Sequence, residues 1–496
     1  SLFSFKDCKN LKELLLPETL ESLGDAVFSG CTSLKTIKIP KNLNYLGDSA
    51  FNACSSLKEI ALTQTLTEIK EYTFYECTSL SKIDLPEHIT DIGAGAFLGC
   101  RSLEFINFPS TLVNIDESAF SGCSSLKKAV LPEGIEQIKE ATFYKCTSLS
   151  SIHLGDGIKV IGDYAFDGCT DLLEVNIPDN IGFIGADCFK DTEWISSLPT
   201  DFNGLKCYKN ILLKSMDSKE DILIPSNITL IAAAAFCDSE RLKEITLPEG
   251  LKRIEDATFK NCIQLKNIKI QESVEYIGEG AFSDCKSLTD ISIPESITHI
   301  NKRSFENCEK LEKIELPKGI NYIGEDAFKG CSLLKNIIIP AKVDKIYEGA
   351  FGFCTSLDNV NFEGSPSYIG NSFYGTGFYN NIKEDEYGCK YVHNHLIECL
   401  DKKREFIIRD GTVSIANRAF SESQISSIDF PKELKIIGDS AFEHCDNLTE
   451  IDIPEGVLYI GKRCFSYCEN LEKAHIPNSI EMAGFGIFLG CNNLKE

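Results

Sequence analysis

The chain has 496 residues, of which 43% are hydrophobic and 25% are charged, so its composition is that of a folded protein. No run of 18 apolar residues occurs, so we expect no membrane span in this chain. Acidic residues exceed basic ones by 74 − 50 = 24, which argues against a nucleic-acid partner, because such binding depends on Lys and Arg neutralising phosphates.

The most informative feature is a repeat of 23 residues, and such a period is the signature of a solenoid. At this period, 496 residues make about 21 coils. A phenylalanine precedes each repeating cysteine by three residues. The cysteines that keep the period are Cys8, Cys31, Cys54, Cys77, Cys100, Cys123, Cys146, Cys169, Cys262, Cys285, Cys308, Cys331, Cys354, Cys445, Cys468 and Cys491.

Each repeat can be interpreted as one coil with a single buried face. In 123–145, the apolar positions expected inside are Leu126, Ala129, Leu131, Ile135 and Ile138. A spacing of two suits a short strand, and the following proline ends it. The residues between the last isoleucine and the phenylalanine predict a one-turn 3₁₀ or α-helix. Stacked coils would bury the apolar faces, with the phenylalanine column as the bulk of the core.

These residues carry a family resemblance. The pattern Cys-x-x-Leu-x-x-Ile-x-Ile/Leu-Pro-x-x-Ile/Leu-x-x-Ile-Gly-x-x-Ala-Phe resembles the BspA-like class of leucine-rich repeats over nearly the whole chain. The resemblance implies a leucine-rich-repeat solenoid of the α/β class, curved and right-handed, with a parallel sheet on its concave side. It also implies a surface-exposed microbial protein that binds molecules of a host or of neighbouring cells. We expect one solenoid domain over 1–496.

Two islands, at 190–235 and 374–419, interrupt the period. They match each other at an offset of 184 residues, which is eight coils of 23. Each has two strand-like segments separated by a short turn, which predict a β-hairpin. The islands are either spacers that adjust curvature or projecting elements that help to bind a partner. Trp194, Phe378 and Tyr379 are the candidate exposed aromatic residues there, although a buried position suits Trp194 equally well.

The 22 cysteines do not predict a disulfide scaffold. Sixteen share one position in the coil, and parallel side chains about 4.8 Å apart do not present two sulfurs to each other. We therefore expect a ladder of free, buried thiols, each able to bond a carbonyl of the neighbouring turn. His393, His395 and Cys399 could together bind a metal, but the matched first island has no such set, so plain surface histidines are the favoured interpretation.

No catalytic constellation stands out, so we expect no enzyme activity, no cofactor and no metal. In each coil, three side chains of the strand after the cysteine should face solvent on the concave side. Phe105, Val130 and His153 occupy such positions in three consecutive coils and are either one binding patch or scattered surface residues. Together with the islands, they are the candidate binding residues.

We therefore expect a non-enzymatic binding solenoid, adhesin-like, at the cell surface or secreted, and monomeric. Its partner would be a macromolecule such as a host or matrix protein or a glycan. The alternative is an intracellular scaffold or receptor-like module, because free thiols are also typical of a reducing cytosol.

Overall fold

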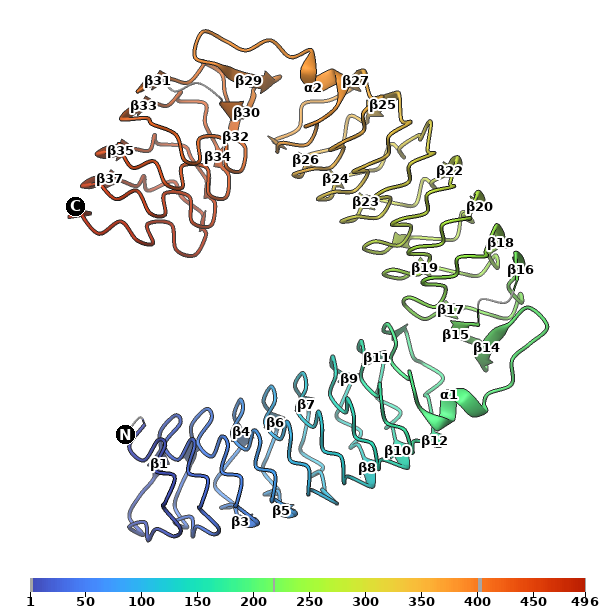
Figure 1. The fold of residues 1–496 in the computed structure, drawn as a ribbon, viewed down its shortest axis with the longest axis vertical. Coiled ribbons are helices and arrows are strands. Elements are labelled where there is room, and N and C mark those ends of the chain that lie inside the picture. Colours follow the sequence, from blue (N-terminus) through green and yellow to red (C-terminus); the bar gives the residue numbers. More distant parts are fainter. Residues whose placement is uncertain (1–2, 217–218, 400–403, 496) are drawn as a thin grey trace. The chain divides into compact units, whose positions relative to one another are not determined.

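The computed structural model describes residues 3–216, 219–399 and 404–495. They form a parallel-strand solenoid of about 20 turns, which confirms the predicted fold class. The chain divides into two compact units (Figure 1). Unit 1 comprises Ser1–Met216 and Leu230–Ala235, and unit 2 comprises Asp217–Thr229 and Phe236–Glu496.

Most coils contribute two short strands, which we call the A strand and the B strand. The A strand follows the cysteine and the B strand precedes the turn that leads to the phenylalanine. The A strands are β3 (Glu59–Ala61), β5 (Lys82–Asp84), β8 (Lys128–Val130), β10 (Ser151–His153), β12 (Glu174–Val175), β16 (Asp221–Leu223), β18 (Glu244–Thr246), β20 (Asn267–Lys269), β22 (Asp290–Ser292), β25 (Asn336–Ile339), β27 (Asn359–Phe362), β31 (Glu405–Ile407), β33 (Ser427–Asp429), β35 (Glu450–Asp452) and β37 (Lys473–His475). The B strands are β1 (Ser22–Leu23), β2 (Tyr45–Leu46), β4 (Glu68–Ile69), β6 (Asp91–Ile92), β7 (Asn114–Ile115), β9 (Gln137–Ile138), β11 (Val160–Ile161), β13 (Phe183–Ile184), β17 (Leu230–Ile231), β19 (Arg253–Ile254), β21 (Tyr276–Ile277), β23 (His299–Ile300), β24 (Tyr322–Ile323), β26 (Lys345–Ile346), β28 (Tyr368–Ile369), β32 (Ser414–Ile415), β34 (Ile436–Ile437), β36 (Tyr459–Ile460) and β38 (Met482–Ala483).

Strands of the same kind pair in parallel from coil to coil, in register with the 23-residue period. Ile152 of β10 lies opposite Ala129 of β8, for example. The apolar positions expected inside are buried, and in the coil of 123–145 none of them is more than 3% exposed. The alternation of buried and exposed residues along each A strand confirms the predicted inward face.

The phenylalanine column runs through the core as predicted. Neighbouring rings stack with centroids 5.2 to 5.7 Å apart in the coils from Phe5 to Phe189. The rings also contact the inward end of the A strand, as Phe120 does with Phe108 at 5.5 Å.

The turn before the phenylalanine is not the predicted one-turn helix. The N–H groups of Ser118, Phe120 and Gly122 donate to carbonyls 22 residues later, in the next coil. The residues between them bond three residues back within their own coil. Because alternate donors are used between coils, the i to i−4 pattern of an α-helix cannot form. The helices among the described residues are α1 (Glu193–Ser197) and α2 (Gly377–Asn380).

The A strand does not line the concave side, so that prediction is wrong. In unit 2 the A strands β16, β18, β20 and β22 follow the outer edge of the curve, and the B strands follow its inner edge (Figure 1). The physical reason is spacing. Stacked rings, 5.3 to 5.4 Å apart from Phe236 to Phe328, exceed the roughly 4.8 Å between strands. The rings pack against the A strands, so that side of the coil is the longer one.

Both islands contain the expected antiparallel hairpin. In the first, β14 (Leu205–Tyr208) pairs with β15 (Ile211–Ser215). In the second, β29 (Cys389–Val392) pairs with β30 (His395–Cys399). Each island begins with a short helix capped by a threonine hydroxyl, Thr192 in α1 and Thr376 in α2. The second strand of each hairpin continues into the next B strand by parallel pairing.

Candidate functional site

The residues of the predicted patch lie on neighbouring A strands. His153 lies directly opposite Val130. Phe105 bridges to Lys128, and the Lys127 ammonium lies 5.2 Å from the centre of its ring. Phe105 is 56% exposed and Val130 63% exposed. The structure therefore brings the three residues to one surface, but this surface belongs to the A strands rather than to the concave side.

The aromatic residues of the islands are not exposed. Trp194 is 5% exposed and packs on Phe189 with ring centres 4.6 Å apart. Phe378, at the matched position, is half-buried and packs on Phe373 at 5.2 Å. Each ring covers the phenylalanine column where the regular coils stop, which is why both turn inward. Tyr379 is also buried, with its hydroxyl bonded to Glu398. The expectation of exposed aromatic residues here is wrong.

The inner edge of unit 2 carries a row of tyrosines that our sequence analysis missed. Each begins a B strand and donates a hydrogen bond to an oxygen of the preceding coil. Tyr276 donates to Asp256 at 3.4 Å, and Tyr322 donates to Asn301 at 2.9 Å. The sequence signal was the recurring tripeptide Tyr-Ile-Gly, at 276–278, 322–324, 368–370 and 459–461. We passed over it because the B strand was treated only as a source of inward isoleucines.

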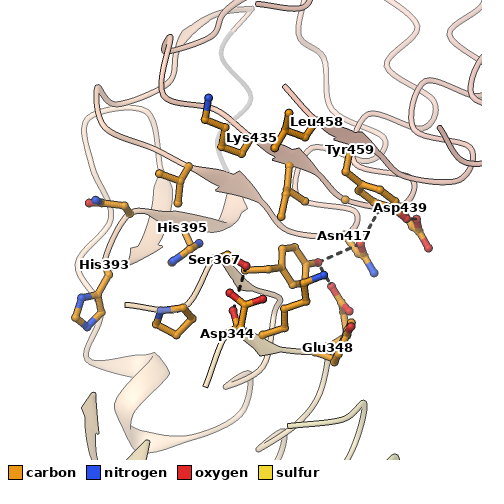
Figure 2. Close-up of a pocket in the computed structure, with 18 of the residues that line it drawn as sticks. Asp344, Glu348, Ser367, His393, His395, Asn417, Lys435, Asp439, Leu458 and Tyr459 are labelled. Carbon is orange, nitrogen blue, oxygen red and sulfur yellow. Dashed lines mark hydrogen bonds between the residues drawn. The ribbon is translucent and has the colours of Figure 1, made fainter. Parts of the chain in front are cut away.

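The row leads into a hollow of about 1230 Å³ where the second island interrupts unit 2. Its walls are B strands from both sides of the island, including β26, β28, β34 and β36 (Figure 2). Tyr368 joins the two walls, because its hydroxyl bonds Glu348 of the preceding coil and lies 3.3 Å from Asn417 beyond the island. We call this space the inner hollow.

Carboxylates predominate on the inner hollow. Five carboxylate side chains and two lysines line it, an excess of 5 − 2 = 3 negative charges. The carboxylates are Glu325, Asp344, Glu348, Asp439 and Glu481, and the lysines are Lys345 and Lys435. Burial raises the pKa of Glu348 above its usual range, although the Tyr368 hydroxyl opposes that shift.

His395 forms part of the wall and is almost fully buried. Its Nδ1 lies 2.7 Å from the Ser414 hydroxyl. Burial, and to a smaller degree the nearby His393, lowers the pKa of His395 to about 4. The imidazole is therefore neutral at pH 7 and adds no positive charge to the wall.

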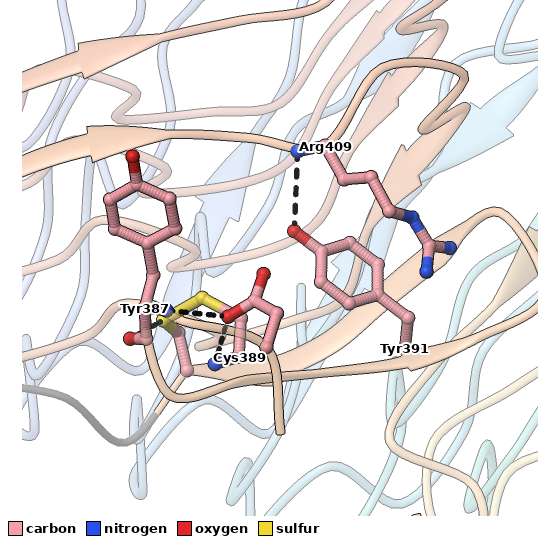
Figure 3. The surroundings of a disulfide bond; sticks show 6 residues. Tyr387, Cys389, Tyr391 and Arg409 are labelled. Atoms are coloured by element: carbon pink, nitrogen blue, oxygen red, sulfur yellow. Dashed lines mark hydrogen bonds between the residues drawn. A yellow bond between two sulfur atoms is a disulfide. The ribbon is translucent and has the colours of Figure 1, made fainter. Parts of the chain in front are cut away.

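The second hairpin holds a disulfide that our sequence analysis did not predict. Cys389 and Cys399 face each other across β29 and β30 and are bonded (Figure 3). The same two positions of the first hairpin hold Leu205 and Ser215. The pairing leaves no thiolate at Cys399 for a metal, and the His393 ring packs on Phe362 instead. Among the described residues, no cluster of three or more His, Cys, Asp or Glu could hold a metal ion.

The cysteine ladder is as predicted. All sixteen of its members are free thiols. From the second coil onward, each donates to the carbonyl of the phenylalanine 25 or 26 residues earlier, as Cys123 does to Phe97 at 3.2 Å. The thiols thus link successive coils and do not form a reactive site. Within the described part of the chain, no helix is long and apolar enough to cross a membrane.

Comparisons with known proteins agree with this architecture. The family described as "BspA type Leucine rich repeat region" matches residues 1–127, 90–214, 204–334, 279–386 and 390–496. A leucine-rich cell surface protein from Faecalibacterium prausnitzii is 30% identical, with 70% of this chain and 84% of that chain covered and a TM-score of 0.35. A leucine-rich repeat protein from Bacteroides ovatus is 23% identical, with 90% and 88% covered and a TM-score of 0.38. No curated protein matches.

Proposed function

The chain belongs to the BspA-type leucine-rich-repeat family, and from that premise we propose that it is an adhesin-like binding protein of a microbial cell surface. The observation that carries the proposal is the inner hollow, which is concave, partly aromatic and edged with unlike charges. Such a surface suits recognition of a macromolecule. No nucleophile paired with a base was found on it, and the repeat fold is typical of binding scaffolds.

Two further observations support a location outside the cytosol. The similar protein from Faecalibacterium prausnitzii is described as a cell surface protein. The bond between Cys389 and Cys399 suits an oxidising compartment. The alternative, an intracellular scaffold, is favoured by the twenty free cysteines. These thiols are mostly buried, however, and a buried thiol tolerates either compartment.

A binding screen tests the proposal. The purified chain would be applied to immobilised matrix proteins, serum proteins and glycans at low and at physiological salt. We expect a saturable partner whose binding weakens on Met482→Ser, a change of a 63% exposed side chain in the inner hollow. Ile338→Ser, on an A strand and 53% exposed, is the matched control.

The patch of Phe105, Val130 and His153 remains a second proposed surface, and Phe105→Ser tests it in the same screen. The absence of any partner, together with protection of the protein from labelling on intact cells, would favour the scaffold.

A further inference from the structure

We propose that the inner hollow binds a segment of a protein partner that is rich in lysine and arginine. This inference rests on the proposed binding function and names its partner class. The observations behind it are the balance of charge, the apolar and aromatic floor, and the fixed shape of the site.

The charge of the hollow favours a cation. Its excess of three carboxylates lies in a chain that has 24 more acidic than basic residues. One of the two lysines, Lys435, donates to the carbonyl of Gly456 at 3.1 Å, which fixes its ammonium at the edge. His395 is neutral, so the wall offers little to repel an incoming ammonium or guanidinium group. A concave surface with one excess sign of charge concentrates ligands of the opposite sign.

The floor suits the rest of a lysine or arginine side chain. Leu458 and Met482 are 38% and 63% exposed, and both line the hollow. Tyr347 and Tyr459 are half-buried beside them. Lysine and arginine bury their aliphatic stems on apolar surface, while their charged ends reach carboxylates or lie over aromatic rings. This chain already uses the second contact, because the Arg253 guanidinium lies 3.9 Å from the centre of the Tyr276 ring.

The site is built before any partner arrives. Asp439 accepts from the Lys462 N–H at 2.7 Å and from the Tyr459 hydroxyl at 3.4 Å, which holds both side chains in place. Tyr368 joins the two walls across the island. Preformed polar groups lower the entropy cost of binding. A volume of about 1230 Å³ exceeds what one side chain fills, so a peptide segment fits better than a single residue.

The test uses the full chain and a short fluorescent peptide in which lysine and arginine alternate with glycine. The site variant carries Asp344→Lys and Glu481→Lys, both exposed residues of the hollow. The control variant carries Asp290→Lys and Glu450→Lys, which make the same change of charge on A strands of unit 2. The same peptide with glutamate in place of its basic residues and a neutral oligosaccharide are the comparison ligands. Binding is followed by fluorescence anisotropy for the peptides and by calorimetry for the oligosaccharide.

We expect saturable binding of the basic peptide that becomes about tenfold weaker in the site variant and changes less than about twofold in the control. Equal weakening in both variants would overturn the inference, because it would show attraction to the net charge alone. Tighter binding of the oligosaccharide, or no binding of the basic peptide, would also overturn it. If the screen yields a partner sensitive to Met482→Ser while the peptide does not bind, this inference fails and the proposed function stands. If the peptide binds and the screen yields no partner, the reverse holds.

Discussion

At the residue scale, the phenylalanine column shows how one side chain stabilises three coils. Phe120 is fully buried, with ring centres 5.2 Å from Phe97 and 5.6 Å from Phe143. Replacing it by alanine removes both stacking contacts and leaves a cavity that neighbouring coils cannot fill. We expect Phe120→Ala to lower the free energy of unfolding by about 3–5 kcal/mol, measured by urea denaturation of the full chain. Phe105→Ala is the matched control, because that ring is largely exposed and its loss should cost less than about 1 kcal/mol. Similar losses from both changes would contradict the assignment of the column to the core.

The thiols give a second residue-scale prediction. In the folded chain at pH 8, we expect only Cys8 to react rapidly with a thiol reagent, because it is the exposed free cysteine among the described residues. Burial keeps the others neutral as well as shielded, and it raises the pKa of the Cys77 thiol to about 12. In denaturant without reductant twenty thiols should react, and after reduction all 22 should react. A count well below twenty in denaturant would mean further disulfides and would contradict the free ladder.

His395 predicts a loss of stability at acid pH. Its pKa is about 4 in the folded chain and 6.5 without burial. Above pH 6.5 both states are neutral, so the histidine has no effect there. As the pH falls toward 4, the unfolded chain takes up a proton that the folded chain does not, and stability falls by up to about 3 kcal/mol. We expect His395→Gln to lose less stability than the parent chain between pH 7 and pH 4.5 in urea titrations. His153→Gln, at an exposed site, should behave like the parent, and an unchanged slope for His395→Gln would refute the linkage.

At the element scale, the sequence predicted the coils well and their curvature poorly. The positions of Leu126, Ala129 and Leu131 predicted which side chains are buried, because alternation along a strand has only two possible outcomes. It could not predict which side of the coil is longer, since that depends on how rings such as Phe120 pack against the A strand. The tyrosine row was missed for a related reason. A tyrosine at one end of a two-residue strand acquires meaning only when its partner, 20 or 21 residues earlier, is known to lie beside it.

The two hairpins differ in one way that can be tested within the same molecule. The disulfide between Cys389 and Cys399 closes a short loop in the second hairpin, and the first has no such bond. Cross-links of this kind stabilise by about 2–3 kcal/mol. We expect mild reduction to speed amide hydrogen exchange in β29 and β30 and to leave β14 and β15 unchanged, as an internal control. Equal changes in the two hairpins, or none in the second, would contradict a stabilising role for this bond.

At the scale of the whole molecule, the question is how far a local change spreads. Our sequence analysis predicts one solenoid domain over 1–496, and the structure divides the chain into two compact units. In a solenoid each coil contacts only its neighbours, so stability is a sum of local terms and damage stays close to its origin.

Phe328→Ala tests this at a fully buried ring of unit 2, stacked on Phe305 and Phe351 with ring centres 5.3 and 5.2 Å away. We expect amide hydrogen exchange in these coils to become at least about a hundredfold faster, since the lost contacts are worth about 3–5 kcal/mol. Coils of unit 1 should keep their exchange rates. Phe353→Ala, in a neighbouring coil but with a ring 53% exposed, should leave both units unchanged. If Phe328→Ala instead speeds exchange equally throughout unit 1, the chain unfolds as one cooperative domain, and unit boundaries have no bearing on its stability.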